Sequence, residues 1–206
     1  MPRAFAEITF TPSVKAAQQR YGSRQANRSF ETATARQQEL TQAETEFIEG
    51  MDGFFQASVG ETGWPYVQFR GGPPGFLKVL DARTIGFADF RGNLQYVSVG
   101  NLDADGRVAL ILVNHADPGR LKIWGRARVI DRAVDPDLVR SLQVPGYAGR
   151  AERAIVIGVE AFDWNCPQHI TPRFTEAEIR EMTASMVAEL AALRKRAAGG
   201  TDPGMP

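Results

Sequence analysis

The spacing of apolar and polar residues changes near residue 50, from a helical period to short runs typical of strands. Before that point, Thr11-Pro12 begins a helix that Gly22 ends, because a cap residue followed by proline is a common helix start. Thr41 and Glu44 have the spacing of a capping box and predict a second helix that ends near residue 50. The polar residues 23–38 between the two helices are interpreted as an exposed arm.

Beyond residue 50, runs rich in aromatic and branched residues alternate with Gly, Pro, Asp or Asn, which is typical of short strands joined by turns. Glu61-Thr62-Gly63 predicts a tight turn between the first two strands, and residues 94–105 fit either a short helix or a further strand. Six or seven short strands favour a barrel over a parallel α/β sheet. The predicted strands are 54–59, 66–69, 76–81, 84–88, 108–114, 120–131 and 155–161.

The strand predicted over residues 120–131 has the clearest alternation. One face would carry only apolar side chains and the other only basic ones. Such a basic face either contacts water or lies opposite an anion or an acidic neighbour. The apolar face holds Leu121, Ile123, Ala127 and Val129, and the basic face holds Arg120, Lys122, Arg126 and Arg128.

The C-terminal region predicts a long helix. Thr175 and Glu178 form another capping box, and apolar residues follow at helical spacing from Ile179 to Leu193. Gly199-Gly200 ends the helix, and residues 201–206 are expected to be disordered. A helix of about 33 Å would contact a partner or run along the outside of the barrel.

Length and composition bound the class of protein. A chain of 206 residues suits one domain with a full core, and the formal net charge of +0 argues against a nucleic-acid or membrane partner. The single cysteine, Cys166, excludes an intramolecular disulfide, and no apolar run suggests a signal peptide or a membrane span, so we expect a cytoplasmic protein. The expected organisation is an arm with helices (1–50), a barrel domain (51–173), a helix (174–198) and a tail (199–206).

Candidate chemistry is concentrated in two segments. Lys78 lies in an otherwise apolar strand after the glycine-rich loop 71–75, and the turn 89–93 adds Arg91 and Asn93. With Arg70 and Arg120, these cations and close-approach glycines predict a phosphate site. The segment 164–169, WNCPQH, either contacts a ligand or an interface or packs its tryptophan into the core.

Metal and hydrolase chemistry has little support. His115 and His169 are the two histidines of the sequence, so a three-histidine metal site is excluded, and the sequence contains no HExxH, GxSxG or Walker motif. Cys166 and His169 are the one local nucleophile–base pair, and proximity in sequence alone does not orient them.

Several motifs, in this order, resemble the pyridoxamine 5′-phosphate oxidase-like family of split barrels that bind flavin mononucleotide (FMN). They are RGGPPGFLKVLD (70–81), ADFRGN (88–93), GNL (100–102), GRLKIWGRA (119–127) and WNCPQHI (164–170), and the last is similar to a segment of one bacterial branch. The resemblance implies a mainly β (α+β) fold, a six-stranded antiparallel split β-barrel with helices at both ends. It also implies a homodimer with two FMN molecules in clefts between the subunits.

The resemblance also implies roles for individual residues. Lys78, Arg91 and Asn93 would hold the FMN phosphate, the backbone at Ala88 and Asp89 would contact the flavin ring, and Arg120 would approach the ring's polar edge. The other residues implied as FMN ligands are Arg70, Asn101 and Lys122, with Trp164, Asn165, Gln168 and His169 contributed by the neighbouring subunit.

The implied function is an FMN-dependent oxidoreductase that acts on a small molecule. The oxidase's paired Arg-Lys phosphate motif is missing, Pro73 replaces an arginine, and the C-terminal substrate-binding pattern is absent, so FMN binding is expected rather than vitamin B6 oxidation. Two alternatives stay open: a split barrel that binds deazaflavin or haem, and a non-catalytic flavin-binding or stress protein.

Overall fold

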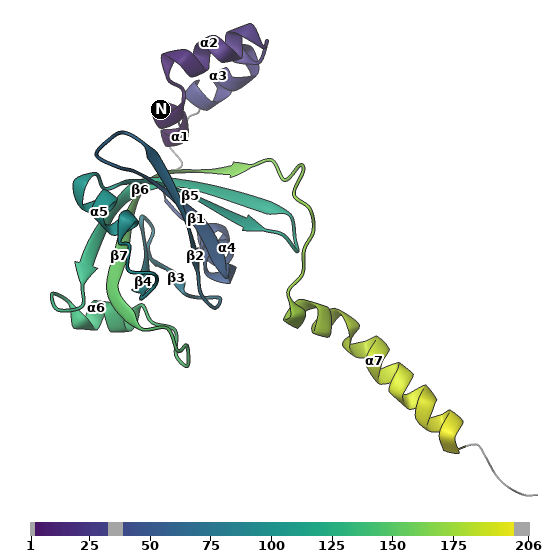
Figure 1. Cartoon of the computed structure of the whole chain (residues 1–206). Coiled ribbons are helices and arrows are strands. Elements are labelled where there is room, and N and C mark those ends of the chain that lie inside the picture. Colours follow the sequence, from purple (N-terminus) through teal and green to yellow (C-terminus); the bar gives the residue numbers. More distant parts are fainter. Residues whose placement is uncertain (1–2, 33–38, 200–206) are drawn as a thin grey trace, which may run out of the picture. The chain divides into compact units, whose positions relative to one another are not determined.

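The structure, a computed structural model, describes residues 3–32 and 39–199. This part of the chain divides into two compact units, one of residues up to 114 together with 119–168, and one of 115–118 together with residues from 169 onward. The first unit contains the sheet and the N-terminal helices, and the second contains the long C-terminal helix (Figure 1). The predicted tail 201–206 and part of the predicted arm, 33–38, lie outside the described residues.

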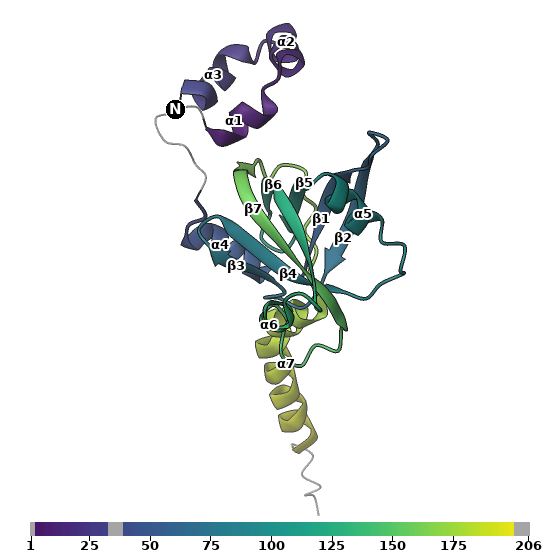
Figure 2. The same ribbon diagram turned by 90° about the vertical axis from the view of Figure 1, so that its left-hand side faces the viewer.

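Within the described ranges seven strands form one antiparallel sheet in the order β2-β1-β5-β6-β7-β4-β3. The sheet curls into a split barrel, with β2 and β3 at its two edges (Figure 2). The strands are β1 (Gly53–Val59), β2 (Pro65–Gly71), β3 (Leu77–Asp81), β4 (Thr84–Phe90), β5 (Arg107–Asn114), β6 (Gly119–Asp131) and β7 (Ala151–Asn165).

The seven predicted strands are confirmed, and the six-strand count implied by the resemblance is wrong by one. Both edge strands keep a ladder with one neighbour, β2 with β1 and β3 with β4, so both belong to the sheet. The predicted turn between the first two strands is also confirmed: Gly60 and Trp64 close it by a backbone hydrogen bond of 3.0 Å, and Gly63 has φ +83°.

The barrel core contains the inward-facing side chains of alternate strand positions. Leu121, Ile123 and Ala127 of β6 are buried as predicted, while Arg126 and Arg128 on the other face are exposed. Arg126 pairs with Glu160 of β7 at 2.7 Å. The basic strand face therefore contacts water and an acidic neighbour.

Four helices of the described residues begin at a local capping residue. Thr11 caps α2, Thr41 and Glu44 form the capping box of α4, Asp135 caps α6, and Thr175 exchanges hydrogen bonds with Glu178 at the start of α7. The helices are α1 (Ala4–Thr9), α2 (Pro12–Arg20), α3 (Arg24–Thr32), α4 (Gln42–Gly50), α5 (Val97–Ala104), α6 (Pro136–Ser141) and α7 (Glu176–Gly199).

One sequence interpretation changes, and the structure decides an alternative that the sequence left open. Residues 24–32 of the predicted arm form helix α3, which is held against α2 by the ion pair of Glu31 with Lys15. The open segment 94–105 contains helix α5, which packs on β1 and β6. The turn 89–93 leads from β4 to α5.

Gly125 lies where two strands approach too closely for a side chain. A Cβ atom there would lie 2.5 Å from the carbonyl oxygen of Gly158 on β7, beside an irregularity in the β6–β7 register. We expect Gly125→Ala to lower the free energy of unfolding by about 1–3 kcal/mol, because the neighbouring backbone would have to move. Urea unfolding followed by tryptophan fluorescence would measure the change.

Gly158→Ala provides the matched control, since a Cβ at Gly158 would have its nearest contact at 3.9 Å, to Arg126. This variant should stay within about 0.5 kcal/mol of the parent chain. Equal losses in the two variants would contradict the close approach at Gly125.

Candidate functional site

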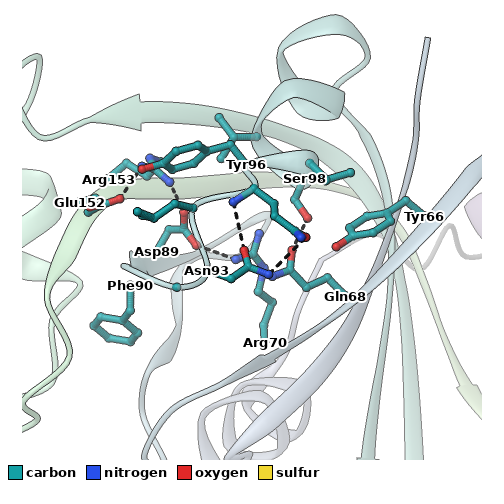
Figure 3. Close-up of a pocket in the computed structure, with 15 residues that line it drawn as sticks. Tyr66, Gln68, Arg70, Asp89, Phe90, Asn93, Tyr96, Ser98, Glu152 and Arg153 are labelled. Carbon is teal, nitrogen blue, oxygen red and sulfur yellow. Dashed lines mark hydrogen bonds and ion pairs between the residues drawn. The ribbon is translucent and has the colours of Figure 1, made fainter. Parts of the chain in front are cut away.

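A buried carboxylate between two guanidinium groups forms the centre of the candidate site. Arg70 Nη1 lies 2.6 Å from Asp89 Oδ1, and Arg153 Nη1 lies 2.7 Å from Asp89 Oδ2 (Figure 3). The three side chains are 12%, 11% and 5% exposed for Arg70, Arg153 and Asp89 respectively. We call these residues the Arg-Asp-Arg triad.

The sheet topology brings the triad together in two different ways. Asp89 of β4 and Arg153 of β7 are directly opposite in the β4–β7 ladder. Arg70 is on β2, at the edge of the sheet farthest from β3 and next to β1 alone. The Arg70–Asp89 ion pair therefore crosses the split of the barrel and joins strands that share no ladder.

Two pockets of about 180 and 150 Å³ lie beside the triad. Gln68, Arg70, Asp89 and Phe90 line both of them. The first pocket extends along the loop 92–96 to the start of α5, and the second extends toward Phe76 and Ala88. Each pocket is smaller than the roughly 300–1,000 Å³ typical of a complete small-molecule site, so each suits part of a ligand.

The N-terminus of α5 opens into the first pocket, which Val97, Ser98 and Val99 line. The first N–H groups of a helix have no partner within the helix, and α5 has no side-chain cap. Its N-cap residue Tyr96 has φ 53° and Leu94 has φ 65°, left-handed conformations that are unusual for residues other than glycine. Strained backbone and free donors at one helix start are typical of an anion-binding site.

Arg70 supplies a further free donor. Its Nε is buried and has no hydrogen-bond partner among the described residues, although its Nη1 is paired with Asp89. A buried donor without a partner is costly. A ligand oxygen at this position would remove that cost.

The charges around the pocket nearly balance. Arg153 also contacts Glu152 at 2.8 Å, and its guanidinium lies 5.0 Å from the centre of the Tyr96 ring. Burial alone would lower the pKa of Arg153, but Asp89 and Glu152 outweigh that effect and raise the pKa above its usual value. The guanidinium therefore stays charged, and selectivity for an anion depends on the free N–H groups rather than on a large net charge.

Four of the residues implied as FMN ligands line these pockets. Arg70 and Asp89 line both, Ala88 lines the second, and Asn93 lines the first. The Asn93 carboxamide accepts a hydrogen bond from the Gln95 N–H at 3.1 Å and so shapes the loop before α5.

Lys78 and Arg91, the two cations emphasised by the sequence, line neither pocket. Leu77 is buried and Val79 packs on the core, so strand alternation places Lys78 on the outer face of β3, where it forms no ion pair with any described residue. Arg91 is 44% exposed and lies 3.8 Å from Glu152. Asn101 is on α5, where its amide donates to Ser58 Oγ at 3.1 Å.

Four other implied ligands gather at the end of β6 and β7 farthest from the triad. Arg120 donates to the Cys166 carbonyl oxygen, and Lys122 is opposite Asp163 in the β6–β7 ladder. Trp164 and Asn165 line a separate pocket of about 450 Å³ with Phe5, Phe10 and Phe30 of the N-terminal segment. Burial raises the pKa of Asp163, which lines the same pocket.

The Trp164 indole N–H donates to Glu44 Oε1 at 2.7 Å and so links β7 to α4. Burial alone would raise the pKa of Glu44, but the hydrogen bonds from Thr41 and Trp164 outweigh it and hold the pKa below its usual value. Trp164 is 43% exposed and its ring contacts Phe47 edge-on, so it is only partly packed in the core.

The remaining two implied ligands, Gln168 and His169, are exposed, and His169 has φ 66°. Cys166 is an exposed free thiol. Within the described residues no cluster of three or more His, Cys, Asp or Glu side chains could hold a metal ion. In residues 3–32 and 39–199, no helix has both the length and the apolar character needed to cross a membrane.

Sequence reasoning missed Gln68, Tyr96, Ser98, Glu152 and Arg153 as pocket residues. Ser98 Oγ donates to Gln68 Oε1 at 2.5 Å, which ties α5 to β2. An available signal was the Glu152-Arg153 pair directly before the apolar run of β7, where charged residues within a buried strand need partners.

A family model described as pyridoxamine 5′-phosphate oxidase matches residues 40–156, which is more than half of the chain. The chain therefore belongs to the pyridoxamine 5′-phosphate oxidase-like family, as its motifs indicated. No curated protein matches the sequence. The matched range contains the whole triad and both adjoining pockets.

Solved structures with the same fold have low sequence identity. HupZ of Group A Streptococcus is 15% identical with a TM-score of 0.50, over 66% of this chain and 99% of that chain. A putative pyridoxamine 5′-phosphate oxidase from Lactobacillus delbrueckii is 16% identical with a TM-score of 0.47, over 61% of this chain and 94% of that chain. At such identities the likeness concerns the fold alone.

The triad should contribute strongly to stability. We expect Asp89→Ala to lower the free energy of unfolding by about 3–5 kcal/mol, because it leaves two buried guanidinium groups without their shared counterion. The control is Asp137→Ala, which removes an exposed ion pair with Arg140 and should cost at most about 0.5 kcal/mol. A loss below about 1 kcal/mol for Asp89→Ala, measured by urea unfolding, would contradict a buried, fully paired triad.

Proposed function

We propose that the chain is an FMN-binding oxidoreductase whose barrel, residues 51–173, holds the FMN phosphate in the pocket between Arg70 and the N-terminus of α5. The observation that carries the proposal is the buried, unpartnered Nε of Arg70 beside an uncapped helix start, in a chain of this family. A phosphate group accepts several hydrogen bonds at once, and helix N-termini and guanidinium groups are its usual donors.

The size of the pockets fits a site that holds the phosphate of FMN apart from its flavin ring. Pockets of about 180 and 150 Å³ suit a headgroup rather than a whole cofactor. The ring would then extend past Asp89 and Phe90, which line both pockets. When bound, FMN would supply hydride or electron transfer to a small-molecule substrate, while the protein supplies orientation and electrostatics.

Homodimerisation is the second part of the proposal, and an apolar outer face of the sheet supports it. On this face Phe55, Phe69 and Ile111 are neighbours in the β2-β1-β5 register, and Val67 lies beside Ala57. Phe55, Val67 and Phe69 are 47%, 59% and 57% exposed. A sheet with apolar residues on both faces normally has both faces covered, and a second copy would cover this one.

The first test of the cofactor is the absorption spectrum of the purified full-length protein. We expect the bands of an oxidised flavin, and mass spectrometry of the released ligand should identify FMN. A Soret band would instead indicate haem, the mass of a deazaflavin would indicate that cofactor, and a colourless protein that fails to bind added FMN would contradict the proposal.

Asn93→Asp tests the position of the phosphate. Asp keeps the oxygen that accepts from the Gln95 N–H, and a carboxylate near a helix N-terminus leaves stability unchanged or raises it by about 0.3–1 kcal/mol. The same charge repels a phosphate, so the FMN dissociation constant should rise about tenfold or more, equivalent to ~1.4 kcal/mol. Flavin fluorescence quenching would measure it.

Gln19→Glu, which adds the same charge at an exposed position of α2, should leave FMN affinity unchanged. Lys78→Ala distinguishes the two candidate phosphate sites. If Lys78→Ala weakens FMN binding and Asn93→Asp does not, the phosphate lies elsewhere than at α5.

Val67→Asp tests the dimer. We expect the parent chain to have the mass of a dimer in light scattering, and Val67→Asp to raise the dimer dissociation constant at least about tenfold, because it buries an unpaired charge in an apolar interface. Val134→Asp is the control, since Val134 is 78% exposed in the turn after β6. A monomeric parent chain, or equal effects of the two substitutions, would contradict an interface on this face.

A further inference from the structure

Helix α7 carries an exposed apolar stripe. Its members are spaced by three and four residues, and at about 100° per residue all five lie within about 40° of Met186 around the helix axis. They are Ile179, Met182, Met186, Leu190 and Leu193, which are 49%, 63%, 64%, 48% and 53% exposed. A stripe of this kind is typical of a helix that packs against another helix.

The two ends of α7 carry opposite charges. Glu176 and Glu178 lie in the first turn, and Arg194 and Arg196 lie near the other end. In addition, the apolar stripe is symmetric about Met186, with Ile179 and Leu193 seven residues to either side and Met182 and Leu190 four residues to either side.

This symmetry means that the helix is complementary to a reversed copy of itself. With a two-fold axis at Met186, Ile179 would meet the partner's Leu193, and Met182 would meet the partner's Leu190. On the helix flanks, Glu176 lies on the same side as the partner's Arg194, and Glu178 on the same side as the partner's Arg196. Each charged pair is offset by two residues, roughly 3 Å along the axis, which long side chains can span.

A parallel pair would instead place the glutamates of one copy beside the glutamates of the other, and the arginines beside the arginines, which is unfavourable. We propose that α7 is an assembly helix that pairs in antiparallel orientation with α7 of a second copy of this chain. The proposal does not depend on FMN binding.

The start of the helix is anchored within its own unit. The Arg173 N–H donates to the His115 carbonyl oxygen at 3.2 Å, and the His115 ring lies within hydrogen-bonding distance of the Thr171 carbonyl oxygen, at 3.3 Å. The Thr175–Glu178 capping box then begins the helix. These contacts fix where α7 begins without using its apolar stripe.

Cysteine cross-linking in the full-length chain tests the pairing directly. In a Cys166→Ser background, chains with Ile179→Cys and chains with Leu193→Cys are mixed and oxidised mildly. Antiparallel pairing brings these two positions together, and we expect the mixed disulfide as the main product. A predominance of Ile179→Cys chains joined to each other, or no cross-link above that of an Ala177→Cys control, would overturn the proposal.

Charge reversal tests the specificity of the pairing. Glu176→Arg makes both members of each Glu176–Arg194 pair basic, and Arg194→Glu makes both members acidic, while Glu178 is kept because it caps the helix. We expect each variant alone to lose most of the Ile179–Leu193 cross-link and the mixture of the two to recover it, because only unlike chains then match at both ends. Glu181→Arg with Lys195→Glu, on the opposite side of the helix, is the control and should leave the yield unchanged.

Flavin absorption measured on the same samples separates this proposal from the proposed function. If the parent chain contains flavin but does not cross-link, the α7 pairing is wrong and the proposed cofactor is unaffected. If it cross-links but contains no flavin, the proposed cofactor is wrong and the α7 pairing is unaffected. Circular dichroism confirms that each variant keeps its helix content. If the charge variants all cross-link equally well, the end charges do not specify the pairing and the proposal is wrong.

Discussion

The ion-paired triad of Arg70, Asp89 and Arg153 is the contact that joins the two sides of the split in the barrel at the candidate site. The Asp89–Arg153 pair follows from the β4–β7 ladder, but the Arg70–Asp89 pair joins the β2 edge of the sheet to a strand with which β2 shares no backbone ladder. A buried carboxylate is stable here only with both guanidinium groups in place. The triad therefore sets the distance across the split, and with it the two pockets that share Arg70 and Asp89.

The same triad supports the loop that leads into α5. Arg153 contacts the ring of Tyr96, the left-handed residue that precedes the helix, and Ser98 is tied to Gln68 on β2. Backbone strain of this kind persists only where surrounding contacts over-determine it. Because Asp89 and Glu152 already neutralise the two arginines, the remaining attraction for an anion comes from oriented N–H groups. This explains how a chain with a formal net charge of +0 could bind a phosphate.

The strands and the starts of α2, α4 and α7 could be predicted from the sequence because their signals are local, such as runs of aromatic and branched residues and the capping pair Thr41–Glu44. The site could be predicted only in part. Arg70, Asp89 and Asn93 fall within the family motifs, but Arg153 lies before the apolar run of β7, and its importance depends on the β4–β7 register. The apolar residues on both sides of Lys78 suggest an inward position in the strand, whereas alternation turns the lysine outward. Helices α1 and α3 have weak sequence signals and depend on tertiary contacts.

Two apolar surfaces of this chain differ in whether they can fix the orientation of a second copy. The outer face of β1, β2 and β5 is apolar without a pattern of charge. It can therefore drive association, but it does not favour one orientation of the partner copy over another. Helix α7 also carries end charges, which distinguish an antiparallel from a parallel partner. Association strength comes mainly from buried apolar area, and orientation comes mainly from charge. A chain that uses both surfaces would therefore obtain affinity from the sheet and geometry from the helix, which is a reason for a long charged helix to follow a barrel that already has an apolar face.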